Sequence, residues 1–151
     1  MPPNDSQVPS PNHVLVVENN NVVLRIATKL LQKLNCTVAC INNGPEALAY
    51  LADPGNPRPN LILVKTYSLG STPDGHEVAQ VVRTQPPFIQ DPILQATPII
   101  GMIPRSLPGQ EHFRRLRYPF LNDFLVKPFR QSDLQWALRV WARRDMRTAK
   151  I

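Results

Sequence analysis

The sequence predicts a single α/β domain in which a parallel five-stranded sheet lies between two layers of helices. Short apolar runs, rich in β-branched residues, alternate along the chain with segments whose apolar residues recur every three or four positions. This alternation of strands and helices is typical of a parallel sheet covered on both faces. The length of 151 residues suits one domain with one core.

Five strands are expected, and the first shows why they are assigned to the interior of a sheet. Residues 14–17 are apolar at every position, as in a parallel strand that is buried on both faces. Residues 61–64 are also apolar at every position, and the other runs contain a polar residue, glycine or proline. The predicted strands are residues 13–17, 36–41, 61–64, 98–103 and 121–126.

Five helices are expected between and after these strands. The clearest has about fourteen residues, with an apolar stripe from Val23 to Leu34. Gly44 and Pro45 open a second helix, and Asp74-Gly75 precedes a third that includes Val78, Ala79 and Val82. Residues 110–117 predict a short basic helix, and residues 133 to about 147 a last one. Residues 85–97 hold three prolines, and no regular element is expected there.

The domain is expected to span residues 13–147, with an unstructured Pro-rich tail at residues 1–12 and a short tail at 148–151. No signal-peptide pattern and no long apolar run occur, so an intracellular protein is expected, in the cytoplasm or alternatively in the nucleus, without membrane association. Cys36 and Cys40 fall on one predicted strand, about 13 Å apart. That is too far for a disulfide, and both are expected to be core thiols.

Positive charge is concentrated in the last third of the chain. The net charge is +6, but residues 1–104 carry six Lys/Arg against seven Asp/Glu, whereas residues 105–151 carry eleven against four. A basic surface of this kind attracts acidic proteins, nucleic acids or anionic lipids, and it does not choose among them. Neither phosphate-binding glycine motif, G-x-G-x-x-G or G-x-x-x-x-G-K-[ST], occurs, which disfavours a nucleotide or flavin enzyme.

Six segments in order resemble the response-regulator receiver domain of two-component signalling. They are the first strand with its polar end (14–20), the Gly-x-Glu-Ala-Leu-like segment 43–48, strand 61–64, Asp74-Gly75, strand segment 98–100 and the Lys-Pro segment 124–129. The resemblance covers roughly residues 13–141. It implies a flavodoxin-like (βα)5 fold with strand order 2-1-3-4-5.

The resemblance also implies that the phosphorylation pocket is degenerate. Lys65 stands where the family has its phosphoacceptor aspartate, and Asn19 replaces one of two acidic metal ligands, whereas Glu18 is retained. Ile103 occupies the position of a strand hydroxyl. Two further positions keep the family pattern in part: the closing lysine is Lys127, and the aromatic switch position is Phe124.

An ammonium group at position 65 is neither a phosphoryl acceptor of this kind nor a magnesium ligand. We therefore expect Lys65 to pair with Glu18 in place of a metal ion; the alternative is that Lys65 extends into solvent. The expected function is a pseudo-receiver, without enzymatic activity, metal or cofactor, that acts by phosphorylation-independent protein contact. The alternatives are a nucleic-acid-binding regulator that uses the basic last third, or a receiver phosphorylated at another carboxylate, such as Asp74.

The expected interaction face lies on the fourth helix, the fifth strand and the fifth helix. An acidic signalling protein is the expected partner, and a homodimer through the same face is an alternative. Trp136 falls off the apolar stripe of its helix, which suits either an interface anchor or packing against the tail of the chain. The basic residues could equally form a solvated surface. The candidate residues are Arg114, Arg115, Arg117, Trp136, Arg139 and Arg143.

Overall fold

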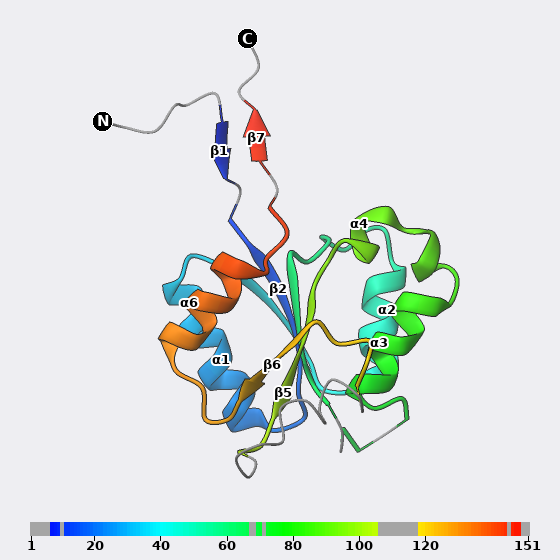
Figure 1. The fold of residues 1–151 in the computed structure, drawn as a ribbon, viewed down its shortest axis with the longest axis horizontal. Coiled ribbons are helices and arrows are strands. Elements are labelled where there is room, and N and C mark those ends of the chain that lie inside the picture. The colour runs from blue at the N-terminus through cyan, green and yellow to red at the C-terminus, as the bar shows by residue number, and fades with distance from the viewer. Residues whose placement is uncertain are drawn as a thin grey trace.

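The computed structural model describes residues 7–9, 11–66, 69–70, 72–105, 118–144 and 146–148. Its centre is a parallel sheet with helices on both faces (Figure 1). The strands of this sheet are β2 (His13–Val17), β3 (Thr37–Ile41), β4 (Leu61–Lys65), β5 (Ile99–Ile103) and β6 (Asp123–Val126). The helices are α1 (Asn21–Lys33), α2 (Gly44–Ala52), α3 (Gly75–Thr84), the 3-10 turn η1 (Phe88–Gln90), α4 (Pro92–Gln95) and α6 (Gln131–Val140).

The order of strands in the sheet confirms the predicted topology. The order is β3-β2-β4-β5-β6, and every neighbouring pair is parallel. Numbered within this sheet alone, that is 2-1-3-4-5. Because all five strands point the same way, the segments that follow β2, β4 and β6 meet at one edge of the sheet, and β2 and β4 flank the point where the strand order reverses.

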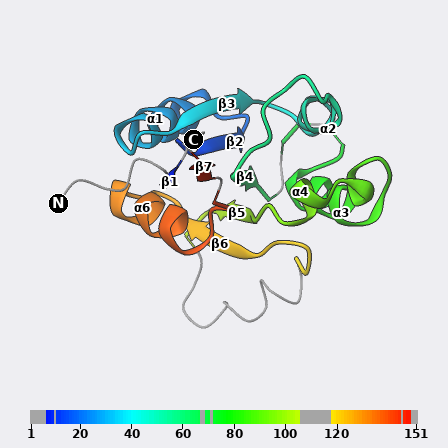
Figure 2. The same cartoon turned by 90° about the horizontal axis from the view of Figure 1, so that it is seen from above.

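Side chains of the inner strands alternate between two apolar clusters, because successive residues of a strand point to opposite faces. Leu15 and Val17 of β2 join the cluster beneath α2 and α3, whereas Val14 and Val16 join the cluster beneath α1 and α6. Figure 2 shows α1 and α6 on one side of the sheet and α2, α3 and α4 on the other. We call these the α1/α6 layer and the α2/α3/α4 layer.

Residues 85–97, where no regular element was predicted, contain η1 and α4. That prediction is wrong because the prolines stand where short helices tolerate them. Pro87 precedes η1, and Pro92 is the first residue of α4. Asp91 caps α4, since its Oδ1 accepts hydrogen bonds from the backbone N–H groups of Ile93 (3.0 Å) and Leu94 (3.1 Å).

The last helix is shorter than predicted. It ends at Val140 and not near residue 147, because the chain beyond it is bound to the segment before β4. Arg143 N–H donates to the Asn60 carbonyl at 2.9 Å, and the Asn60 side-chain amide donates to the Arg143 carbonyl at 2.7 Å. These two hydrogen bonds take the place of the backbone hydrogen bonds that a longer helix would form here.

Beyond this tether, the chain pairs with a segment from the other end of the sequence. Met146–Thr148 forms a strand, β7, that pairs antiparallel with β1 (Gln7–Pro9), which lies within the segment 1–12 that is expected from the sequence to be a tail. The ribbon projects from the main body in Figure 1.

Three smaller expectations have different outcomes. Cys36 is buried, but Cys40 is exposed, so only one of the two is a core thiol. The fifth strand begins at Asp123, two residues later than predicted, and the predicted basic helix at residues 110–117 lies outside the described residues.

Within the described part of the chain, no helix has both the length and the apolar character needed to cross a membrane.

Candidate functional site: an ion-paired pocket at the carboxyl edge of the sheet

Glu18, which directly follows β2, is the centre of this pocket. Its side chain has no exposed surface, and burying a carboxylate is costly unless its oxygens are paired. Oε1 forms an ion pair with Nζ of Lys127, and Oε2 accepts a hydrogen bond from the backbone N–H of Asn20 at 3.0 Å. Oε2 also lies 3.8 Å from Nζ of Lys65. Both oxygens of the carboxylate therefore have partners within the protein.

Lys65 is the last residue of β4, and its ammonium group lies inside the pocket. Nζ donates a hydrogen bond to Oδ1 of Asn19 at 2.8 Å, in addition to the longer ion pair with Glu18. The predicted pairing of Lys65 with Glu18 is thus present, but Asn19 is the nearer partner. The side chain of Lys65 is 25% exposed, so its aliphatic stem is mostly covered while the ammonium reaches the carboxylate.

Backbone contacts hold the remaining walls of the pocket. Ile103, the last residue of β5, is buried, and its carbonyl accepts a hydrogen bond from the Lys127 N–H at 2.8 Å. A Cβ added to Gly75 would lie 1.7 Å from the Lys65 carbonyl oxygen. Only a glycine therefore lets the start of α3 approach the end of β4 this closely.

Asp74, the alternative acceptor, has a structural role at the start of α3. Its Oδ1 accepts a hydrogen bond from the backbone N–H of Leu69 at 2.9 Å, and its own N–H donates to Glu77 Oε1 at 3.0 Å. The side chain therefore holds the loop after β4 against the first turn of α3. This agrees with the preference of aspartate for helix starts.

Phe124 belongs to a group of rings that the sequence did not reveal. Its ring centre lies 6.2 Å from that of Tyr118, which lies 5.2 Å from the imidazole of His76. The backbone N–H and Nδ1 of His76 both bond to the Thr66 carbonyl, at 2.9 and 2.8 Å. Thr66 follows Lys65 directly, so the ring group is joined to the end of β4. No periodicity or motif in the sequence predicts that the rings of Phe124, Tyr118 and His76 lie together.

The predicted interaction face is only partly brought together. Trp136 is 44% exposed on α6, Val140 is 55% exposed one turn later, and Arg139 is exposed between them. Arg143, also expected on this face, is directed away from these three residues. Its guanidinium turns to the amino edge of the sheet, where it donates to Thr97 Oγ1 at 3.3 Å and to the Pro59 carbonyl at 3.2 Å. The other three candidates, Arg114, Arg115 and Arg117, lie outside the described residues.

The residues of the pocket do not fit a magnesium ion. Magnesium takes oxygen ligands in near-octahedral geometry, usually from more than one acidic or carbonyl group. Here one carboxylate is present, its oxygens are engaged, and two ammonium groups lie beside it. Among the residues that the structure describes, no group of three or more His, Cys, Asp or Glu side chains is placed to hold a metal ion.

Sequence comparison finds two relatives of this chain among known proteins. No family model matches the chain. Transcription factor SKN7 of Saccharomyces cerevisiae is 31% identical over 122 residues, which are 81% of this chain but 17% of SKN7. Protein PilG of Pseudomonas aeruginosa is 25% identical over 126 residues, or 83% of this chain and 84% of PilG.

Among solved structures, the receiver domain of the sensor histidine kinase PA1611 from P. aeruginosa has a TM-score of 0.69 and 25% identity. The match covers 87% of this chain and 98% of that domain, which was crystallised with a magnesium ion coordinated in its active-site cleft. The chain described here thus has the fold of response-regulator receiver domains.

Proposed function

We propose that this chain is a pseudo-receiver of two-component signalling, which acts through protein contacts without being phosphorylated. The observation that carries the proposal is the position of Lys65 at the carboxyl end of β4, with its ammonium group directed to Glu18 and Asn19. The resemblance to receiver domains assigns the phosphoacceptor to this position. A protonated amine cannot accept the phosphoryl group in the way that a carboxylate does.

The pocket further supports a signalling role that needs no metal. In the PA1611 receiver domain the cleft holds magnesium, whereas here Lys65 and Lys127 supply positive charge beside the single carboxylate. The ammonium of Lys65 takes the place that a cation would have, and Ile103 supplies no hydroxyl for a phosphoryl oxygen. The carboxylate of Glu18 is thus paired within the protein, with one positive charge in excess, and no switching by phosphoryl transfer is expected.

The charge of the α1/α6 layer favours an acidic protein partner. Arg25, Lys29 and Lys33 are exposed on successive turns of α1, which contains no acidic residue. In α6, Arg139 is exposed beside Trp136, and the only acidic residue is Asp133. The described helices of the opposite layer carry two glutamates and one arginine, so the described helices of the two layers differ in the sign of their net charge. Such asymmetry orients an acidic partner and speeds association.

Exposed apolar groups in the same layer favour a protein over a nucleic acid. Val22 and Ile26 of α1 are 62% and 47% exposed among the lysines and arginine, and Trp136 and Val140 are exposed on α6. Phosphate groups of a duplex would use the cations but not these side chains, whereas protein interfaces are enriched in buried aromatic residues such as tryptophan.

Incubation with acetyl phosphate and magnesium tests the absence of phosphorylation. Intact mass spectrometry of the wild-type chain is expected to show no increase by one phosphoryl group. The Lys65→Asp variant serves as the comparison, because it restores a carboxylate at the acceptor position, and magnesium is expected to raise the melting temperature of this variant more than that of the wild type. A phosphorylated wild-type chain would contradict the proposal, and an adduct mapped to Asp74 would favour the alternative acceptor.

Binding to a partner isolated by pull-down tests the interaction face. Arg139→Glu is expected to slow association and weaken its salt dependence, and Trp136→Ala to speed dissociation. Glu18→Gln, checked for an intact fold, is the control and is expected to change binding little. If Glu18→Gln alone abolished binding, the pocket and not the α1/α6 layer would be the working surface. Steeply salt-dependent binding of duplex DNA with no dependence on Trp136 would favour the nucleic-acid alternative.

A further inference from the structure

A pocket of about 460 Å³ lies at the amino edge of the sheet, opposite the ion-paired pocket of Glu18. Its lining comes from the start of β2 at His13, the start of β3 at Thr37, the loop before β4, α4, and the segment after α6. This volume falls in the range of small-molecule sites. We call it the amino-edge pocket.

Two arginines from distant parts of the sequence line this pocket. Arg58 comes from the loop before β4, and Arg143 follows α6. Among the described residues that line the pocket, none is acidic. Guanidinium groups present planar forks of N–H donors that match the oxygens of a carboxylate or a phosphate. The chemistry of the lining is therefore that of an oxyanion site.

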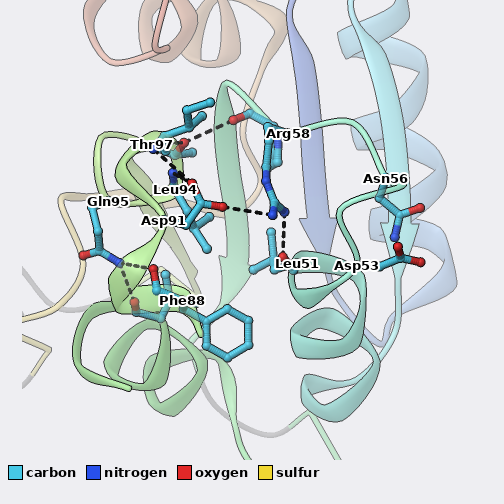
Figure 3. A network of polar contacts seen from close by, with 12 residues as sticks. Leu51, Asp53, Asn56, Arg58, Phe88, Asp91, Leu94, Gln95 and Thr97 are labelled. Carbon is cyan, nitrogen blue, oxygen red and sulfur yellow. Dashed lines mark hydrogen bonds and ion pairs between the residues drawn. The ribbon is translucent and has the colours of Figure 1, made fainter. Parts of the chain in front are cut away.

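Arg58 is held rigidly, as Figure 3 shows. Its Nη1 donates to the Leu51 carbonyl at 2.6 Å, and its Nη2 lies 2.9 Å from Oδ2 of Asp91, whose other oxygen caps α4. Of the five N–H donors of a guanidinium, these contacts occupy two. Nε and one hydrogen on each Nη thus remain for a ligand within the described part of the chain. Because the Arg58 side chain is already fixed, ligand binding would cost little conformational entropy at this residue.

Arg143 is fixed on the other side of the pocket by the Thr97 hydroxyl and the Pro59 carbonyl. Its backbone is also tied to Asn60, which is 3% exposed. Both guanidinium groups are thus anchored to the framework and not free in solvent. An anion between them would meet a site that exists before binding.

Apolar side chains complete the pocket and limit the kind of ligand. Ile93 of α4 is 46% exposed, and Pro57 and Pro11 also line the space. A bare inorganic ion would leave these groups in water. A small organic anion can place its charged group at the arginines and its apolar part against Ile93.

We propose that the amino-edge pocket binds a small organic oxyanion, a carboxylate or phosphate monoester with a short apolar group, between Arg58 and Arg143 and against Ile93. This site is independent of the Glu18 pocket, which lies at the other edge of the sheet. It would make the domain a sensor of a small molecule as well as a protein-binding module. The alternative is that both arginines act only as structural cross-links.

Phenyl phosphate is a suitable probe, with inorganic phosphate and benzyl alcohol as probes that carry only one of its two parts. In an NMR titration of the full chain, the backbone amides of Thr37, Arg58 and Ile93 are expected to shift saturably with phenyl phosphate. Inorganic phosphate and benzyl alcohol are each expected to bind at least about tenfold more weakly, because each lacks one set of contacts. Equal affinity for phenyl phosphate and benzyl alcohol would overturn the proposal.

Ile93→Glu and Ile93→Gln form the decisive pair of variants. Both remove the isoleucine, whose exposed side chain makes no hydrogen bond, and both are expected to keep the fold. The glutamate adds a like charge beside the ligand and is expected to weaken phenyl phosphate binding at least about tenfold more than the glutamine does. Equal weakening by the two variants, or shifts confined to the α1 amides of Arg25 and Lys29, would show general attraction to a basic surface and would overturn the proposal.

Discussion

The two edges of the parallel sheet use their basic residues differently. At the carboxyl edge, Lys65 and Lys127 face one buried carboxylate, so the carboxylate is fully paired and one positive charge is in excess. At the amino edge, Arg58 pairs with Asp91, but Arg83 and Arg143 donate to neutral oxygens of loops and strand starts. The first arrangement closes a site, and the second joins segments that are far apart in the sequence.

This difference follows from the chemistry of the two cations. A lysine ammonium is a compact point charge that pairs well with one carboxylate, whereas an arginine guanidinium has several donors in a plane. Arg83 uses both of its terminal nitrogens: it donates to the carbonyls of Leu94, Gln95 and Thr97 and to Asn122 Oδ1, at 2.7 to 3.2 Å. One side chain thereby fixes the end of α4 and the segments before β5 and β6.

The largest expected effect is at the carboxyl edge. Lys127→Met removes the nearer cation of Glu18 and leaves Oε1 of a fully buried carboxylate without its ion pair, while Oε2 keeps the hydrogen bond from Asn20 and the 3.8 Å contact to Lys65. We expect the free energy of unfolding to fall by about 3 kcal/mol, measured by urea denaturation. Lys127→Arg, which keeps the charge, is the control and is expected to lose less. Equal stability of the Met and Arg variants would mean that the charge of Lys127 is not needed.

A smaller loss is expected at the amino edge from Arg83→Met. Burial lowers the pKa of Arg83, and its four acceptors are neutral, so part of the benefit of its hydrogen bonds is lost to desolvation. We expect a loss of about 2 kcal/mol in the free energy of unfolding, because the acceptors lose their donor. Arg139→Met, on the exposed face of α6, is the matched control and is expected to change stability by less than about 0.5 kcal/mol. Comparable losses in both variants would contradict a special role of Arg83.

Lys65→Met is expected to cost still less, about 1 kcal/mol, because its ion pair with Glu18 is long and its side chain is partly exposed. Thermal denaturation with the Lys127→Met variant alongside measures the difference directly. A loss equal to that of Lys127→Met would show that the two lysines share Glu18 evenly. No loss at all would favour the alternative in which Lys65 extends into solvent.

The smallest effect concerns His13, at the start of β2. Burial lowers the pKa of its imidazole, whose Nδ1 and Nε2 lie 2.7 Å from the hydroxyls of Thr37 and Tyr50. The unfolded chain therefore binds a proton more readily than the folded one, and the contribution of His13 to stability is present above about pH 6.5 and is lost as the pH falls below it. His13→Gln should flatten this part of the stability profile between about pH 5 and 7. An unchanged dependence of stability on pH in this variant would mean that a group other than His13 titrates in this range.

The sequence was sufficient for the sheet and for the centre of the ion-paired pocket. Apolar runs defined the strands, and the carboxyl ends of parallel strands had to lie at one edge of the sheet, which is where Glu18, Lys65 and Lys127 come together. The position of Arg143 could not be predicted in this way. It depends on hydrogen bonds to Asn60, 83 residues earlier, which end α6 sooner than its apolar stripe suggests.

Other features were missed because their signals are local and small. Asp91 followed by Pro92 is a typical helix start, but the prolines nearby led to the prediction that the segment has no regular structure. The contact between His76 and Thr66 uses a backbone carbonyl, and no residue type announces such an acceptor. Side-chain partners such as Asn19 for Lys65 depend on rotamers that a one-dimensional pattern does not encode.

The ribbon of β1 and β7 gives the fold a defined response to mechanical load. Gln7 pairs with Thr148 and Pro9 with Met146, so the outer ends of both strands lie at the same end of the ribbon. A force that pulls these ends apart separates the paired residues of the two strands one pair after another, from the outer end inward. Only afterwards does tension reach β2, which lies between β3 and β4 and must be sheared along both neighbours. The ribbon thus supplies extensible length that yields before the sheet does.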